Sequence, residues 1–388
     1  MSVTAAAGFE AAGVVAGLKS TGARDVALIR NVGPLQNAAA VFTSNRCKAN
    51  PVLWSEQVMR DGTVSAIVLN SGGANCYTGA QGFQVTHSTA ESVGEALGVS
   101  AGDVLVCSTG LIGDQLDLGK ITSGVTEAAA SLSGATGVDD GEAAARAIMT
   151  TDTVPKQATV RSEQGWSIGG MAKGAGMLAP GLATMLVVIT TDAALDSADL
   201  DAALRASTRV TFDRLDSDGC MSTNDTVALL ASGASGVAPD AAAFTAALTE
   251  VCRDLTLQLQ ADAEGAAHDV AIRVVNAASE DEAVVVARAV SRSNLFKAAI
   301  FGNDPNWGRV LAAVGTTDAA FDPYGIDVAM NGVRVCRAGE PFESRDLVDL
   351  APRKVAVDID LHAGTATATI WTNDLTHDYV HENSAYAS

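Results

Sequence analysis

The amino-acid sequence predicts an α/β or α+β protein in which helices cover sheets in layers. Short apolar runs alternate with longer segments that carry apolar residues at three- and four-residue spacing, which is typical of strands interleaved with amphipathic helices. The run Met185–Ile189 is apolar throughout, as in a strand buried on both faces. The length of 388 residues exceeds what one hydrophobic core usually holds, so we expect two lobes.

The first half of the chain is expected to alternate strands with helices. Short apolar runs predict strands over 38–43, 64–70, 103–107 and 166–171. Helical spacing of apolar residues predicts helices over 85–97, 118–132 and 142–149. The segment 133–141, rich in glycine and aspartate, predicts the loop before the last of these helices.

The second half follows the strand that starts near Met185. We expect helices over 197–207, 240–260 and 281–291 and a strand over 270–275. Ser232–Pro239 is rich in glycine, serine and proline, which is typical of a linker. Apolar and polar residues alternate over 354–361 and again over 365–371, so these two segments predict a C-terminal β-hairpin.

Composition and charge exclude several classes of function. The chain is 48% hydrophobic and 18% charged, which is a globular composition. Its net charge of −20 repels phosphate backbones, so we expect no nucleic-acid partner. The six cysteines form no C-x-x-C pair, which predicts reduced thiols in a cytoplasmic protein, and no signal peptide is visible. Gly174–Thr191 is uncharged, but its glycines and proline make a membrane-spanning helix implausible.

The same uncharged stretch contains the strongest candidate nucleophile, Thr184. A glycine-rich turn with Pro180 precedes it, and the apolar strand follows it. A hydroxyl at that junction can attack the preceding carbonyl of Ala183. Cleavage there would give Thr184 a free α-amine, with an ordinary pKa of about 7.7–8.0, that can take the proton from its own hydroxyl. The alternative is a glycine-rich loop that leads into a core strand and has no chemical role.

Two other patterns are weaker candidates for chemistry. Gly174-Ala-Gly176-Met-Leu-Ala179 matches the G-x-G-x-x-A dinucleotide pattern, but a strand is expected where that motif needs a helix. His377 and His381 have i,i+4 spacing without a nearby cysteine, so we expect no zinc site. Because no histidine is an obvious base, a threonine activated by its own amine becomes more attractive.

Three turn segments remain open to two interpretations. Ser108-Thr109-Gly110 either supplies a hydroxyl and an N–H to a developing oxyanion or forms an ordinary turn after a strand. The aspartate-rich segment 213–225 lacks the spacing of a calcium loop, so we expect it to be solvated or to line a pocket. The cluster Asn303–Arg309 is either structural or part of a polar site.

An ordered set of segments carries a resemblance along nearly the whole chain. These are Phe42–Arg46, Asn70–Gly72, Cys107–Gly113, Ile148–Thr153, Lys173–Leu186, Ser222–Thr226, Phe301–Arg309 and the short tail after Asn383. Together they resemble the ornithine acetyltransferases (glutamate N-acetyltransferases) of cyclic arginine biosynthesis. Each motif is weak alone, but the ordered set is highly specific.

The resemblance implies self-cleavage between Ala183 and Thr184. The products would be an α chain of residues 1–183, which contains the N-terminal lobe, and a β chain of residues 184–388. These would stay associated, as an α2β2 assembly or larger. The implied fold is a helix–sheet–sheet–helix sandwich with an additional smaller lobe, similar to the autoprocessed β-aminopeptidases.

The resemblance also implies a reaction, which is transfer of acetyl from N2-acetyl-L-ornithine to L-glutamate without metal or cofactor. Thr184 would form an acetyl ester in a ping-pong cycle, while Thr109 and Gly110 stabilise the oxyanion. The implied substrate-binding residues are Thr150, Lys173, Thr184, Glu264, Asn383 and Ser388. Glu264 would pair with the side-chain ammonium of ornithine, but glutamate brings a carboxylate to the same end, so a cation or water must compensate. Use of acetyl-CoA as a second donor is left open.

Two alternatives to a transferase remain. An amidase or aminopeptidase of the same architecture would pass the acyl group from Thr184 to water and release acetate without glutamate. A non-catalytic binding protein would keep one intact chain.

Overall fold

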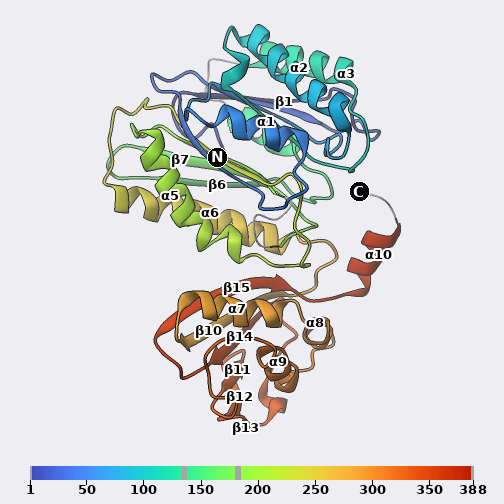
Figure 1. Cartoon of the computed structure of the whole chain (residues 1–388), viewed down its shortest axis with the longest axis vertical. Coiled ribbons are helices and arrows are strands. Elements are labelled where there is room, and N and C mark those ends of the chain that lie inside the picture. Colours follow the sequence, from blue (N-terminus) through green and yellow to red (C-terminus); the bar gives the residue numbers. More distant parts are fainter. Residues whose placement is uncertain (1, 133–137, 180–184, 386–388) are drawn as a thin grey trace.

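The chain folds into a larger lobe joined to a smaller C-terminal lobe (Figure 1). The computed structural model describes residues 2–132, 138–179 and 185–385. Three sheets are present in these residues, two in the larger lobe and one in the smaller.

The larger lobe contains two stacked sheets. The first has the strand order β1 (Phe9–Val14), β2 (Val26–Asn31), β4 (Ala66–Asn70), β5 (Val104–Ser108). The second has the order β3 (Asn37–Phe42), β9 (Thr226–Ala231), β8 (Leu186–Thr191), β7 (Ser167–Lys173), β6 (Lys156–Arg161). β8 is the central strand of its sheet and pairs antiparallel with β7 and parallel with β9.

Helices cover the outer face of each sheet (Figure 1). On the first sheet these are α2 (Gly79–Leu97) and α3 (Leu118–Ser131), and on the second α5 (Ser197–Arg209) and α6 (Ala241–Ala261). Two further helices pack on the edge strands of the first sheet, α1 (Asn50–Val58) beside β5 and α4 (Val138–Ala147) beside β1. Short 3-10 turns lie at Ala101–Asp103, Phe212–Arg214 and Arg345–Leu347.

Strand β8 shows how the sequence specifies these layers. Its side chains alternate between two hydrophobic cores: Leu186 and Val188 lie between the sheets, whereas Val187 and Ile189 face the helices α5 and α6. All four side chains are buried, so the strand needs apolar residues on both faces. The predicted layered α/β class is confirmed, and the order of layers is helix, sheet, sheet, helix.

The smaller lobe is built on a mixed sheet of its own. Its strands lie in the order β13 (Glu340–Pro341), β12 (Val333–Arg337), β11 (Asp327–Met330), β14 (Lys354–Asp360), β10 (Asp269–Ala277), β15 (Ala366–Asn373). The helices α7 (Glu280–Ser291), α8 (Asn294–Phe301) and α9 (Trp307–Val314) belong to this lobe, and α10 (His377–Ala385) extends beyond β15 toward the larger lobe (Figure 1).

The predicted C-terminal hairpin is wrong in its pairing, although both strands exist. β10 lies between β14 and β15, parallel to the first and antiparallel to the second. The connecting turn crosses the end of β10, where the N–H groups of Ala363 and Gly364 each donate to the carbonyl of Asn276 at 2.8 Å. Period-two alternation identifies a half-buried strand but not its neighbour, because a distant strand can take the place between two consecutive ones.

Strands β7 and β8 flank the predicted cleavage point within one sheet. Six residue pairs join them, beginning with Lys173 opposite Leu186. The expectation that residues 1–183 form the N-terminal lobe is wrong, because β8, β9, α5 and α6 also belong to the larger lobe. The cleavage into residues 1–183 and 184–388 stays a prediction, and Ala183 and Thr184 themselves lie outside the described residues.

Candidate functional site

Three of the predicted site residues meet at the ends of their elements. Lys173 is the last residue of β7 and is 2% exposed. Its ammonium donates to the Thr150 hydroxyl at 2.8 Å and to the Thr109 hydroxyl at 3.3 Å. Thr109 follows β5, and Thr150 follows α4. The sandwich therefore brings together residues from three separate segments around one buried lysine.

The turn at Thr109-Gly110 is held in a conformation that needs glycine, and it borders a cavity. The Thr109 N–H donates to the Asn70 carbonyl at 3.0 Å, which fixes the turn to the end of β4. Gly110 has φ +130°, and a Cβ there would lie 2.9 Å from the backbone of Gly73. Only glycine fits this position. Among the described residues no acceptor pairs with the Gly110 N–H, and a cavity of about 650 Å³ opens beside Gly110 and Thr150.

A buried chain of charges supports the lysine. Asp152 lies 3.9 Å from the Lys173 ammonium and 2.7 Å from that of Lys156, which also contacts Asp262 at 2.6 Å. The Gly174 N–H donates to Asp152 at 2.6 Å. Burial would raise the pKa of Asp152, but Lys173 and Lys156 outweigh it and lower that pKa to about 2. Burial lowers the pKa of Lys173, with Asp152 opposing the shift.

Sequence reasoning missed this chain as a functional feature. Asp152 lies within a segment noted only for resemblance, and Asp262 is 106 residues from Lys156 along the chain. A signal existed in the i,i+4 spacing of Asp152 and Lys156, but those residues lie in a loop and a strand rather than a helix.

Glu264 and Asn383 form a second part of the site next to the first. The Glu264 carboxylate accepts from the Thr151 hydroxyl at 2.7 Å and from the Asn383 amide at 3.0 Å. Thr151 directly follows Thr150, which contacts Lys173, so these two adjacent threonines link Glu264 to Lys173. A Cβ at Gly176 would stand 2.5 Å from the Glu264 carboxylate, so the glycine gives this side chain its space.

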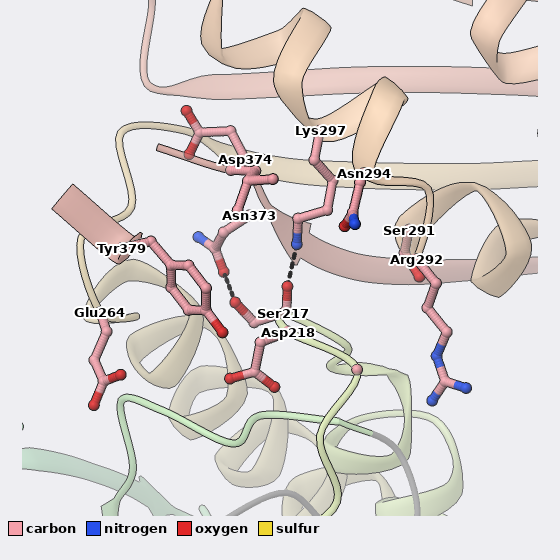
Figure 2. A pocket seen from close by; sticks show the side chains of 12 residues that line it. Ser217, Asp218, Glu264, Ser291, Arg292, Asn294, Lys297, Asn373, Asp374 and Tyr379 are labelled. Atoms are coloured by element: carbon pink, nitrogen blue, oxygen red, sulfur yellow. Dashed lines mark hydrogen bonds between the residues drawn. The ribbon is translucent and has the colours of Figure 1, made fainter. Parts of the chain in front are cut away.

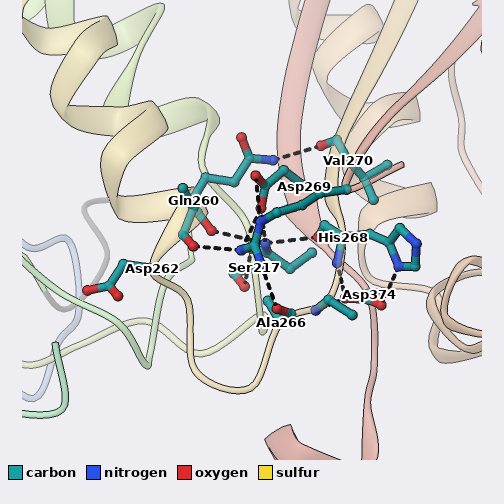
Figure 3. Close-up of polar contacts among 12 residues, drawn as sticks. Ser217, Gln260, Asp262, Ala266, His268, Asp269, Val270 and Asp374 are labelled. Atoms are coloured by element: carbon teal, nitrogen blue, oxygen red, sulfur yellow. Dashed lines mark hydrogen bonds and ion pairs between the residues drawn. The ribbon is translucent and has the colours of Figure 1, made fainter. Parts of the chain in front are cut away.

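The loop that carries Glu264 is fixed where the two lobes join (Figure 3). The Gln260 amide donates to the carbonyls of Val270 and Thr372 at 3.1 and 2.8 Å. His268 contacts Asp374 at 2.7 Å, and the Asp374 carboxylate also accepts from the His268 backbone N–H. Both ends of the segment between α6 and β10 are therefore held against β15, and Glu264 lies between them.

Thr184 and Ser388 lie outside the described residues, but the residue after Thr184 is well anchored. The Met185 N–H donates to the Asp225 carboxylate at 3.1 Å, and the Met185 carbonyl accepts from the Thr226 N–H at 3.1 Å. Asp225 is completely buried. Burial raises its pKa well above the ordinary value, and the Met185 N–H only partly offsets this effect. Sequence reasoning placed Asp225 in an aspartate-rich loop and in a segment that carries the resemblance, but gave it no role of its own.

The remaining motifs from the sequence analysis are not part of this site. Asn306 caps α9 by accepting from the Arg309 N–H at 3.2 Å, so the 303–309 cluster has a structural role. His377 packs edge-on against Phe301. In the described part of the chain no group of three His, Cys, Asp or Glu could hold a metal ion. Residues 174–179 do not open a helix, so the dinucleotide interpretation stays rejected, and no described helix could cross a membrane.

Comparison with known proteins gives one consistent family. The ArgJ family profile matches residues 10–388. The arginine biosynthesis bifunctional protein ArgJ of Streptomyces coelicolor is 63% identical over 388 residues, which is 100% of both chains. The protein of that name from Thermobifida fusca is 61% identical over 388 residues, again 100% of both. The Mycobacterium leprae protein is 54% identical over 391 residues, covering 100% of this chain and 96% of the relative.

Two solved structures are also similar. The ornithine acetyltransferase of Mycobacterium tuberculosis, complexed with ornithine, is 51% identical, with a TM-score of 0.45 over 48% of this chain and 96% of the other. The arginine biosynthesis bifunctional protein ArgJ of Bacillus halodurans is 37% identical, with a TM-score of 0.49 over 51% and 97%.

Proposed function

The chain belongs to the ArgJ family, and from this premise we propose that it transfers acetyl from N2-acetyl-L-ornithine to L-glutamate. The observation that carries the proposal is the meeting of Lys173, Thr109 and Thr150 at one edge of the sheets. In the sheet register Lys173 stands opposite Leu186, two residues after Thr184. The relatives at 54–63% identity bear the name arginine biosynthesis bifunctional protein, which fits this reaction.

Thr184 is the proposed nucleophile. The hydrogen bonds of Met185 to Asp225 and Thr226 fix the backbone directly after it. Attack of the Thr184 hydroxyl on the Ala183 carbonyl would transfer the acyl group from the Thr184 nitrogen to its oxygen, and water would then hydrolyse the resulting ester. The products would be an Ala183 carboxylate and a free Thr184 α-amine, which is the base for later turnovers. The two fragments would stay together because β7 and β8 remain paired and buried within one sheet.

Lys173 has a specific role in the proposed oxyanion site. Because its ammonium donates to the Thr109 oxygen, the hydroxyl proton of Thr109 is free to donate elsewhere. That proton and the Gly110 N–H would stabilise the negative charge that develops when Thr184 attacks the acetyl carbonyl. Ornithine would then leave, and the glutamate amine would attack the acetyl-threonine ester to complete a ping-pong cycle.

The substrate contacts follow from the charges around this centre. Lys173, which contacts Thr150, would receive a substrate carboxylate, while Glu264, held by Asn383, would receive the side-chain ammonium of ornithine. Ser388 remains a proposed contact. Acetyl-CoA as a second donor, an α2β2 or larger assembly and a cytoplasmic location are further expectations for this protein.

Denaturing mass spectrometry and product analysis test the proposal. Purified protein should give fragments of residues 1–183 and 184–388, and Thr184→Ala should abolish both cleavage and acetyl transfer. Thr190→Ala, on the same strand, is a control that should still be cleaved. Acetate release that does not depend on glutamate would favour the amidase. An intact chain that transfers acetyl at full rate would exclude the proposed mechanism.

A further inference from the structure

A second cavity lies where the two lobes meet, and Glu264 is one of the residues that line it (Figure 2). Its volume is about 330 Å³. The larger lobe contributes Ser217, Asp218 and Glu264, whereas the smaller lobe contributes Lys297 from α8 and α10 contributes Tyr379. The Glu264 carboxylate belongs both to this cavity, which we name the junction cavity, and to the site around Lys173.

Lys297 is the buried cation of the junction cavity. It is 6% exposed, and its ammonium donates to the Ser217 carbonyl and to the Thr372 hydroxyl, the latter at 3.4 Å. Within the described residues no carboxylate lies in ion-pair distance of this ammonium. Among the neighbouring acids, Asp216 pairs with Arg292 and Asp374 with His268, whereas Asp218 acts on the ammonium only from beyond ion-pair distance. A buried charge normally has a charged or strongly hydrogen-bonded partner, so this ammonium is suited to an anionic ligand.

Asp218 and Glu264 are the carboxylates of the cavity that form no ion pair among the described residues. Asp218 accepts from the Cys220 N–H at 3.1 Å, and Glu264 accepts from Thr151 and Asn383. The Tyr379 ring stands between them in Figure 2. Burial, followed by the charges of Asp218 and Glu264, raises the pKa of Tyr379 to about 12, so its hydroxyl remains a neutral donor.

We propose that the junction cavity receives the side chain of the bound amino acid and matches either charge. Lys297 would pair with the side-chain carboxylate of glutamate, while Asp218 and Glu264 would together receive the terminal ammonium of ornithine. This assignment rests on the proposed acetyl transfer. It supplies the missing cation, because Glu264 alone cannot accommodate both side chains.

The two half-reactions separate the two ligands, so isotope exchange is the appropriate assay. A ping-pong enzyme exchanges labelled ornithine with N2-acetylornithine in the absence of glutamate, and labelled glutamate with N-acetylglutamate in the absence of ornithine. The Lys297→Met variant should raise the KM for glutamate by about tenfold or more, since one partner of a buried charge pair is lost. The KM for ornithine should stay the same or fall.

A surface lysine and the converse variant control this test. Lys354→Met, an exposed position on β14 of the same lobe, should leave both exchanges unchanged. Asp218→Asn should raise the KM for ornithine by a similar factor and leave that for glutamate unchanged or lower. If Lys297→Met does not fold, the Asp218→Asn variant alone tests the role of the junction cavity.

The possible failures are distinguishable. Wild-type protein that catalyses neither exchange contradicts the proposed function itself. Wild-type protein that catalyses both, with variants that change the two KM values equally or not at all, overturns the role of the junction cavity and leaves the proposed function standing.

Discussion

Replacing Lys156 with methionine tests whether the buried charge chain stabilises the fold. Lys156 is completely buried and contacts Asp152 at 2.7 Å and Asp262 at 2.6 Å. The two carboxylate side chains are 0% and 7% exposed. Methionine has a similar length, so the substitution removes the positive charge while it leaves little empty space.

The expected loss follows from the carboxylates that are left behind. Removing one partner of a buried ion pair destabilises a protein by about 3–5 kcal/mol. For a chain of 388 residues, an unfolding entropy of about 2.1 cal/mol/K per residue converts this loss to a Tm decrease of about 4–6 °C. In the variant Asp152 still has the Lys173 ammonium at 3.9 Å, so we expect a destabilisation near the lower end of this range.

Thermal and urea unfolding measure the effect, with Lys354→Met as an exposed lysine control. The control should unfold within about 0.5 kcal/mol of the wild type, as surface substitutions usually do. Adding Asp262→Asn to Lys156→Met should restore part of the stability, because Asp262 is the carboxylate that loses its ion pair while Asp152 keeps Lys173. A Lys156→Met protein that matches the control would refute the reasoning.

The acid limb of the stability curve gives an independent check on the same pair. The pKa of Asp152 in the folded protein, about 2, is below its ordinary value of 3.8, so its contribution is fully present above pH 3.8. That contribution, about 2 kcal/mol, is lost as the pH falls from about 4 to about 2. In Lys156→Met the pKa of Asp152 moves toward its ordinary value, so the loss over this range should become smaller.

Two further predictions concern the proposed reaction. Gly110→Ala should lower kcat by about 10²–10³, because a Cβ 2.9 Å from Gly73 displaces an oxyanion donor. Gly113→Ala, which shares a positive φ but has open space around it, should keep most of its activity. The KM for glutamate should rise as the pH increases through about 8, because burial lowers the pKa of Lys297 to about 8, against Asp218, Asp216 and Asp374, and the ammonium then loses its proton. An unchanged KM between pH 7 and 9.5 would contradict this role of Lys297.

Sequence patterns predicted the elements whose burial is uniform or strongly periodic. The apolar run of β8 corresponds to side chains buried in the two cores on either side of the strand. The spacing of Phe244, Leu248 and Val251 in α6 corresponds to side chains buried in one of these cores. Other elements carry a weak local signal. β1 consists largely of alanine and glycine, and β6 begins at the buried Lys156, so neither shows an apolar alternation.

The residues of the candidate site also differ in how strong a local sequence signal they carry. The local pattern of a hydroxyl and a glycine after a buried strand left Thr109 and Gly110 open to two interpretations, and the oxyanion role that the resemblance implies for them stays a prediction. Asp225 and Lys297 could not be predicted, since their roles depend on burial and on partners that are remote in sequence. No local rule distinguishes a buried lysine from the exposed lysines that are far more common.

The register of β7 and β8 links the fold to the proposed chemistry. Antiparallel pairing of Lys173 with Leu186 brings both ends of the intervening segment to the same edge of the sheet. If that segment were cut, six buried residue pairs would still hold β7 and β8 together. In the proposed mechanism the new α-amine would belong to Thr184, two residues before Leu186, which is the partner of Lys173 in the sheet register. Because β8 is the central strand of its sheet, we expect the fragments on either side of the proposed cut to stay associated.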